Sequence, residues 1–309
     1  MFGILYNFLI MPGLLFTAFV GLLSTWVDRK VTARIQWRVG PPIYQPFADI
    51  LKLLGKETFV PEGGSKLVFL SAPLIGLAAV TLVSTMLWTL NVNIYGSFIG
   101  DLIVIYYLLM IPSLALMIGG SASRNPFSAL GASREMKLVL AYELPFIIAI
   151  AMVIARTGSI IVGNIIGYQS IHGMMIGSPS GAAAFLVCLL VVQAKLGFVP
   201  FDTAEAEQEI MSGTLLEYSG APLAAFKLTK AMLLFTLPVF LITLFLGGID
   251  TYSLSGALWF VAKYFIILTA IVLIKNTNPR LRVDQAVRFF WGPVTVLAVI
   301  SFVLAMMGR

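Results

Sequence analysis

Acidic residues are scarce in this sequence, and five of its 14 aspartates and glutamates gather within residues 198–220. No lysine or arginine lies between Lys195 and Lys227, so the segment carries a net negative charge. Clustered carboxylates raise one another's pKa and can hold and pass protons near neutral pH. The segment therefore predicts a proton or charge relay. Its candidate members are Asp202, Glu205, Glu207, Glu209 and Glu217.

The acidic segment also predicts a short helix. Asp202 is a favourable N-cap residue, and Glu205 would occupy the third helical position, as in a capping box. Glu205 and Glu209 would then share one helix face at i, i+4 spacing, where like charges destabilise a helix. An ordinary solvated surface helix is the alternative interpretation. The segment directly follows an apolar run, and this position favours the interpretation that it is a functional relay.

Three further charges lie inside apolar runs: Glu143, Lys195 and Lys263. Ionisable groups within a membrane usually face the interior of a helix bundle and mark functional sites. The two lysines have the alternative of extending to the membrane surface. Glu143 is shorter and lies roughly 8 Å inside its run, from the rise of a helix. We expect Glu143 and Lys195 to belong to the relay.

The composition indicates the elements that hold these groups. The chain is 59% hydrophobic and 11% charged, whereas a soluble domain carries about 25% charged residues. A membrane-spanning helix needs about 20 mostly apolar residues. We therefore predict an all-α polytopic membrane protein that forms a single membrane domain over residues 1–309. The eight predicted spans are residues 4–27, 67–90, 101–121, 138–156, 181–199, 226–247, 256–275 and 289–307.

The basic residues predict the orientation in the membrane. Sixteen of the 20 lysines and arginines fall in connections on one face, and Arg156 and Arg309 fall on the other. Basic loops usually stay in the cytoplasm. We expect a multi-pass protein of the cell (plasma) membrane with its basic loops in the cytoplasm and both termini outside. The first apolar run lacks the basic flank and cleavage site of a signal peptide, so we expect it to remain as a helix.

The composition also excludes several kinds of site. Cys188 is the only cysteine and His172 the only histidine, so this chain cannot build a disulfide, an iron–sulfur site or a cysteine zinc site within itself. We expect no metal site, no catalytic residue and no cofactor in this chain. No nucleotide-binding motif is present, and basic residues that record topology give no reason to expect nucleic acid.

The first basic connection contains two further patterns. Lys30, Arg34 and Arg38 are spaced four apart and would form a ladder along one helix face, which residues 40–42 (Gly-Pro-Pro) would end. Residues 47–56 alternate apolar and charged positions, as in an amphipathic helix on a membrane surface. The basic residues either record topology and contact lipid headgroups or dock a cytoplasmic partner.

Six stretches together resemble one known family, the H subunit of respiratory complex I and its relatives. The resemblance covers essentially the whole chain, and the acidic block is its most specific part. The stretches, in the family's order, are DRKVTARIQWRVGP at 28–41, QPFADILKLLGKE at 45–57, AYELP at 141–145, PFDTAEAEQE at 200–209, EYSG at 217–220 and PRLRVDQ at 279–285.

One departure from the family pattern narrows the resemblance. Quinone-reducing members carry extra residues, including a further Gly-Pro, between the first Gly-Pro and the following Gln-Pro. Here only residues 42–44 separate Gly40-Pro41 from Gln45-Pro46. This shorter form is similar to the branch found in energy-converting, membrane-bound nickel–iron hydrogenases and related ferredoxin-dependent sulfur reductases.

The resemblance implies a tilted eight-helix bundle that joins a cytoplasmic, hydrogenase-like redox module to antiporter-like membrane subunits. This chain would be a non-redox subunit of an oxidoreductase complex, with iron–sulfur clusters and a possible nickel–iron centre in its partners. Glu143, Lys195 and the acidic segment would relay charge or protons. The residues expected to dock the redox module or to fix loop carboxylates are Arg29, Lys30, Arg34, Arg38, Arg280, Arg282 and Asp284.

The sequence leaves alternatives open. Within the family, the chain could instead serve a quinone-reducing complex I. From other classes, it could be a self-sufficient secondary ion transporter or a purely structural anchor. Midplane charges and broken helices are typical of a transporter, but the sequence has no evident internal repeat, and its acidic cluster lies at the membrane surface. Protons, sulfur and quinone remain alternative terminal acceptors, and H⁺ and Na⁺ remain alternative pumped ions.

Overall fold

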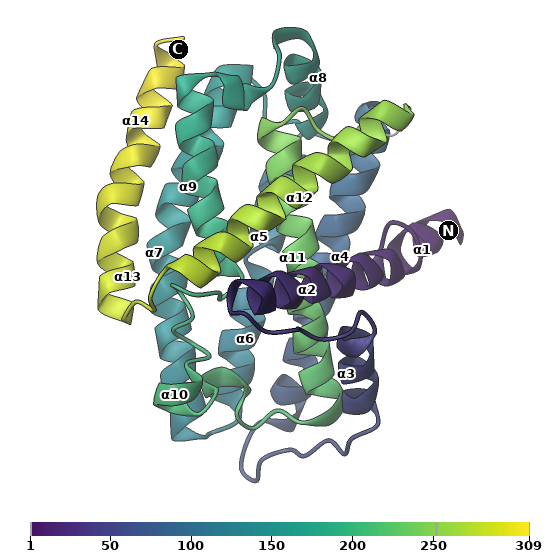
Figure 1. The fold of residues 1–309 in the computed structure, drawn as a ribbon, viewed down its shortest axis with the longest axis vertical. Coiled ribbons are helices and arrows are strands. Elements are labelled where there is room, and N and C mark those ends of the chain that lie inside the picture. Colours follow the sequence, from purple (N-terminus) through teal and green to yellow (C-terminus); the bar gives the residue numbers. More distant parts are fainter. Residues whose placement is uncertain (1, 251–252, 309) are drawn as a thin grey trace.

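The computed structural model describes residues 2–250 and 253–308, and this part of the chain folds into helices joined by turns and loops, without a strand (Figure 1). The prediction of an all-α polytopic membrane protein is confirmed. The long helices are α2 (Leu14–Ile35), α4 (Lys66–Val92), α7 (Pro126–Thr157), α9 (Pro179–Lys195), α11 (Gly220–Phe245) and α12 (Leu254–Thr277). The shorter helices are α1 (Phe2–Leu9), α3 (Gln45–Leu54), α5 (Asp101–Leu108), α6 (Ile111–Ala122), α8 (Val162–His172), α10 (Glu207–Ile210), α13 (Val283–Phe289) and α14 (Thr295–Met306).

Seven helical spans of the described residues are long and apolar enough to cross a membrane, and α9, with 17 residues, is shorter. These eight correspond to the eight predicted apolar runs. Their bounds differ most for the fourth run, because α7 begins at Pro126, well before the predicted start at residue 138. Arg134 and Lys137, which were expected in a basic loop, therefore lie on α7.

The centre of the bundle is α11, which is buried over nearly its whole length. It packs against α2, α3, α4, α9 and α12. By contrast, α12 and the helical segment from α13 to α14 bury only about a quarter of their most apolar windows, 28% each. Their remaining apolar side chains face outward, as expected for helices that contact lipid or other membrane subunits.

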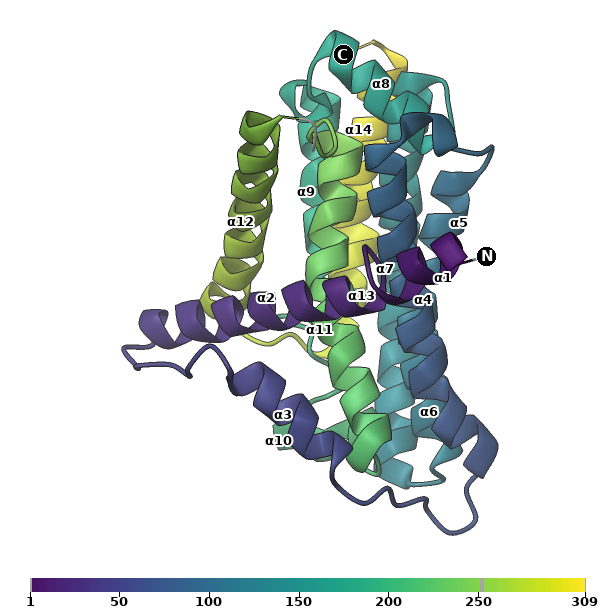
Figure 2. The same cartoon turned by 90° about the vertical axis from the view of Figure 1, so that its right-hand side faces the viewer.

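The second helix, α2, lies across the bundle (Figure 2). It crosses α11 at Gly21, where a Cβ atom would lie 2.5 Å from the carbonyl oxygen of Ala231, so a larger residue has no room. Three polar contacts attach α2 to α12: the Ser24 hydroxyl lies 2.5 Å from the Tyr264 hydroxyl, Asp28 forms a salt bridge of 2.7 Å with Lys275, and Asn276 donates to the Thr32 hydroxyl at 3.0 Å. The charged end of α2 is thereby held beside α12.

Local signals explain where the two helices that carry Glu143 and Lys195 begin. At the start of α7, the Asn125 side chain accepts a hydrogen bond from the backbone N–H of Phe127, and Pro126 occupies the first turn. At the start of α9, Ser178 accepts from Gly181, and Pro179 follows the cap. Capping side chains and an early proline both favour a helix start. These helices pack against each other along the core.

Candidate functional site: a charge-lined cavity and a buried ion pair

A cavity of about 490 Å³ lies among α2, α3, α6, α7, α11 and the chain that follows α9. Apolar side chains such as Leu22, Ile50 and Phe226 line part of it. Charged side chains also line it, with equal numbers of acidic and basic residues. The charged residues are Asp28, Arg29, Asp49, Glu135, Lys195, Asp202, Glu205, Lys227, Lys230 and Lys275. The fold therefore brings charges from distant parts of the chain to one space.

Lys195 lines this cavity and pairs with Glu143 behind it. The Lys195 Nζ atom lies 2.5 Å from Glu143 Oε1, and the side chains are only 3% and 9% exposed. The hydroxyl of Tyr106 donates to Glu143 Oε2 at 2.5 Å, so both carboxylate oxygens have a partner. This contact decides between the two alternatives for Lys195, because its ammonium group lies in the interior rather than at the membrane surface.

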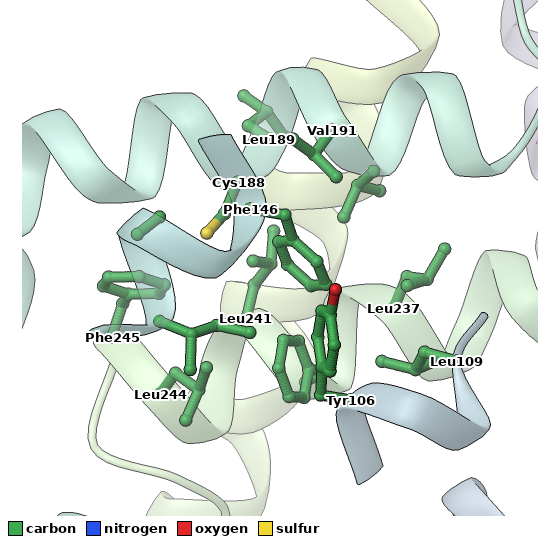
Figure 3. Packing of buried hydrophobic residues seen from close by; sticks show 14 of the residues in the cluster. Tyr106, Leu109, Phe146, Cys188, Leu189, Val191, Leu237, Leu241, Leu244 and Phe245 are labelled. Atoms are coloured by element: carbon green, nitrogen blue, oxygen red, sulfur yellow. The ribbon is translucent and has the colours of Figure 1, made fainter. Parts of the chain in front are cut away.

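Aromatic side chains surround the ion pair. The Lys195 ammonium lies 4.8 Å from the ring centre of Tyr142 and 5.0 Å from that of Phe146, distances typical of cation–π contacts. Tyr106 and Phe146 lie side by side within the apolar cluster formed by α5, α7, α9 and α11 (Figure 3). The pair is thus a charged group set in an apolar core, with the cavity on one side.

The acidic segment differs from its predicted structure. A helix capped by Asp202 does not form, and α10 spans only Glu207–Ile210, followed by left-handed backbone at Met211 and Ser212. The segment packs closely on α7 instead: a Cβ atom on Gly131 would lie 2.7 Å from the backbone nitrogen of Thr214. The prediction of a capping box, with Glu205 and Glu209 on one helix face, was wrong because tertiary packing and ion pairs override the local preference.

The acidic side chains are held by distant basic or polar partners rather than by one another. Glu205 pairs with Lys230 at 2.7 Å, and Glu209 pairs with Arg134 at 2.6 Å. The Glu217 carboxylate accepts from Asn125 at 2.5 Å. Glu207 lies on α10, but its side chain is outside the described part of the structure.

Asp202 is tied to the segment before α13. Arg280 forms a salt bridge of 2.6 Å with its carboxylate and also donates to its backbone carbonyl. Burial raises the pKa of Asp202 above its ordinary value, although Arg280 and Lys230 oppose the shift. The pKa of Glu209, by contrast, is lowered by its hydrogen bond from Arg134. Compared with ordinary carboxyl groups, Asp202 therefore holds a proton more readily and Glu209 less readily.

The predicted docking residues fall into two groups. Arg29 contacts a loop carboxylate, through a salt bridge of 2.8 Å with Asp49 on α3. Burial raises the pKa of Asp49, but hydrogen bonds from Arg29 and Gln45 outweigh burial and lower it overall. Arg280 makes the corresponding contact with Asp202. The exposed group consists of Arg34, Arg38, Arg282 and Asp284, and Lys30 is half-buried.

The first basic connection, between α2 and α4, matches in part the predicted amphipathic helix and basic ladder. The amphipathic helix is present as α3, which buries Pro46 and Leu53 and exposes Leu51 and Leu54. The basic ladder is incomplete, because α2 ends at Ile35 and Arg38 lies beyond the turn that follows it.

Sequence reasoning missed Glu135 and Lys230 as members of the site. Charge patterning assigns both to basic cytoplasmic connections, but Glu135 is 6% exposed on α7 and both line the cavity. A signal for Glu135 exists in the sequence: small residues at Ser128 and Gly131 continue the buried face of α7 before residue 138. The salt bridge between Asp28 and Lys275 has no such signal, because 247 positions separate its partners.

The remaining singled-out groups lie elsewhere. Lys263 donates to the carbonyl of Leu246, at the C-terminal end of α11, at 2.5 Å. His172 is exposed at the end of α8 and stacks on Tyr168. Among residues 2–250 and 253–308, no group of three or more histidine, cysteine or acidic side chains is placed to hold a metal ion.

The fold and the site define the class of protein: a multi-pass helical membrane protein with a charge-lined cavity and a buried ion pair. The sequence model of the NADH dehydrogenase family matches residues 8–306. The chain is 33% identical to the H subunit of NADH-quinone oxidoreductase from Dehalococcoides mccartyi, over 97% of this chain and 84% of that protein. It is 32% identical to the corresponding protein of Thermomicrobium roseum, over 96% of this chain and 94% of that protein. The chain therefore belongs to the NADH dehydrogenase family and is a membrane protein of the H-subunit type.

The fold is also similar to that of a chain in the membrane-bound sulfane sulfur reductase, an archaeal respiratory membrane complex. The TM-score is 0.88 at 30% sequence identity, over 98% of this chain and 99% of that chain. The resemblance predicted from the six sequence stretches is confirmed by these comparisons.

Proposed function

We propose that this chain is the membrane coupling subunit of a complex I-like energy-converting hydrogenase or sulfur reductase. It anchors a cytoplasmic redox module and relays proton or charge changes to ion-pumping, antiporter-like subunits. The single observation that carries the proposal is the buried ion pair of Glu143 and Lys195, located where the cavity that begins at the acidic segment meets the apolar core.

The ion pair suits a relay because its charge state is coupled to its surroundings. Removing one partner of a buried ion pair costs about 3–5 kcal/mol, since the other charge is left unpaired in a medium of low polarity. A proton that reaches Glu143 neutralises its carboxylate, so that Lys195, 3% exposed, needs another counter-charge nearby. A charge change at the cavity is therefore transmitted to the apolar core rather than lost to solvent.

The second part of the proposal concerns the partners. The exposed side chains of Arg34, Arg38, Arg282 and Asp284 suit contact with a soluble partner that carries iron–sulfur clusters. The similarity to a chain of a sulfane sulfur reductase supports a redox module of the hydrogenase or sulfur reductase type. In this arrangement, the face of the bundle that carries most of the basic residues, together with α3 and α10, lies in the cytoplasm. This orientation is the one expected for basic loops.

The test uses the whole complex, purified and reconstituted into liposomes. Glu143→Gln is expected to abolish ion translocation driven by the redox reaction, while the subunits stay associated. Glu62→Gln, which neutralises an exposed glutamate outside the cavity lining, serves as the matched control and is expected to pump normally. Intact pumping in Glu143→Gln would mean that the relay role is wrong.

Quinone reduction is a second candidate, favoured by the apolar lining of the cavity near α2 and α3 and by the names of the NADH-quinone oxidoreductase relatives. A quinone analogue that inhibits the redox reaction of the complex, and loses potency when Phe226 is replaced by a polar residue, would favour this alternative.

A further inference from the structure

Glu135 lies in the cavity wall and is not explained by the contacts described so far. It belongs to α7, is 6% exposed and lines the same cavity as Glu205, Lys230 and Lys195. The charges of these three residues act on it, as do the polar groups of Ser113 and Tyr142. Ser113 on α6 is within hydrogen-bonding reach of the Glu135 carboxyl group.

Among the residues that the structure describes, each of the other carboxylates of the cavity wall forms a salt bridge, and Glu135 forms none. Lys195 is already committed to Glu143. An unpaired carboxylate in such a buried place is costly, whereas a neutral carboxyl group that donates and accepts hydrogen bonds is not. Within the part of the chain that the structure describes, the salt bridges of the lining pair Asp28 with Lys275, Asp49 with Arg29, Asp202 with Arg280, and Glu205 with Lys230.

Ser113 and Tyr142 connect this position with the ion pair through one hydroxyl contact and one ring contact. The Ser113 hydroxyl lies 3.2 Å from the Tyr142 hydroxyl, and the ring of Tyr142 packs against the Lys195 ammonium at 4.8 Å. The groups therefore lie in the order Glu205 with Lys230, then Glu135 with Ser113 and Tyr142, then Lys195 with Glu143.

We propose that Glu135 is a proton-holding station between the acidic segment and the buried ion pair, an inference that rests on the proposed relay function. At rest its carboxyl group is protonated, and Glu143 is the carboxylate paired with Lys195. When the relay operates, the O–H bond at Glu135 breaks and an O–H bond forms at Glu143. Glu135 is then the carboxylate, and Lys195, released from the neutral Glu143, becomes its counter-ion.

This transfer keeps the charge of the group constant. Before and after it, one carboxylate and one ammonium are present, so no unpaired charge is created inside the apolar core. Return of Glu135 to its protonated form requires a proton from the side of Glu205 and Lys230, which gives the relay a direction. Lys195 acts in this scheme as a counter-ion for two carboxyl groups and not as a proton carrier.

The experiment compares two substitutions of Glu135 in the complete complex. Glu135→Gln keeps the size and the hydrogen bonding of the side chain but cannot release a proton, and Glu135→Asp keeps the proton but shortens the side chain. A proton-holding role predicts that the Asp variant pumps better than the Gln variant. A packing role predicts the reverse order, so the ranking separates the two roles.

We expect Glu135→Gln to slow redox-driven ion translocation at least about tenfold, because loss of a positioned proton-transfer group costs ~100-fold or more in the step that it serves. Infrared spectroscopy of the complex in H₂O and D₂O supplies a second readout. The carbonyl stretch of a protonated carboxyl group should disappear in Glu135→Gln and remain in the Glu62→Gln control.

Two results would overturn the assignment of Glu135: a Gln variant that pumps at the wild-type rate, or a carbonyl band that is unchanged by the substitution. Glu143→Gln, measured in parallel, separates this inference from the proposed function. If Glu143→Gln stops pumping while Glu135→Gln does not, the proton-holding role of Glu135 is wrong and the relay role of Glu143 is retained. If both variants pump normally, the relay itself is wrong.

Discussion

Replacement of Lys195 by methionine tests whether the buried ion pair is an electrostatic unit. The substitution removes the ammonium group 2.5 Å from Glu143 Oε1 and leaves a carboxylate whose side chain is 9% exposed. At an effective dielectric constant of about 20, the lost attraction is roughly 6–7 kcal/mol before desolvation is counted. Since desolvation of the lysine opposes this attraction, we expect a net loss of about 3–5 kcal/mol in the free energy of unfolding.

The measurement is thermal unfolding of the purified protein in detergent, followed by tryptophan fluorescence, for which the chain offers five tryptophans. A loss of this size corresponds to a fall in Tm on the order of 5–10 °C. The double variant Lys195→Met with Glu143→Gln should recover most of the loss, because replacing both partners of a buried pair is often nearly neutral.

Lys137→Met is the matched control, since Lys137 is an exposed lysine on α7 whose replacement should change the free energy of unfolding by less than about 0.5 kcal/mol. The reasoning is refuted if Lys195→Met unfolds at the same temperature as the control, or if the double variant is no more stable than the single one.

Two further predictions concern the surface. Arg34→Glu combined with Arg38→Glu should detach the cytoplasmic module during purification, measured by the subunits that co-purify, because both side chains are exposed and would oppose an acidic partner. The ion pair of Glu209 and Arg134 should stabilise the fold by at most ~1 kcal/mol, since Glu209 is half exposed. Because the pKa of Glu209 is lowered on folding, this contribution is present above its ordinary value of 4.5 and is lost as the pH falls below it. Thermal unfolding of Glu209→Gln as a function of pH measures it.

Controls for both predictions come from the same chain. Lys52→Glu, on the exposed side of α3, changes charge by the same amount per site as the arginine substitutions and should leave the module attached. If the module also detached in this control, its loss from the arginine variant would be an effect of overall charge and not of these two side chains. For Glu209, equal pH dependence in the wild type and in Glu209→Gln would contradict the predicted contribution.

Part of the site could be predicted from the sequence because membranes constrain it strongly. A charge inside an apolar run is expensive in lipid, so Glu143 and Lys195 stand out as functional candidates from the sequence alone. Their mutual contact could not be predicted, because 52 positions separate them and Lys195 also had the alternative of extending to the membrane surface. The first twelve residues of α7 resemble a loop because they carry charges, so the sequence gives too short a helix there and hides Glu135.

The acidic segment shows the limit of local rules most clearly. Its residue types favour a capped helix, yet Glu205 and Glu209 are held by Lys230 and Arg134, which come from two different helices. These ion pairs, and the close packing of the segment on Gly131, outweigh a capping preference worth about 1 kcal/mol.

The sequence by itself determined that this chain spans a membrane, which segments do so, and to which family it belongs, because lipid requires long apolar helices and the family's charged stretches are contiguous in the chain. Only the tertiary structure decided which charges meet. The pairs of Asp28 with Lys275 and of Glu143 with Lys195, and the placement of Glu135 in the wall of the same cavity, depend on how the helices cross one another. Helix crossing is set by the packing of whole surfaces, which no short stretch of sequence contains.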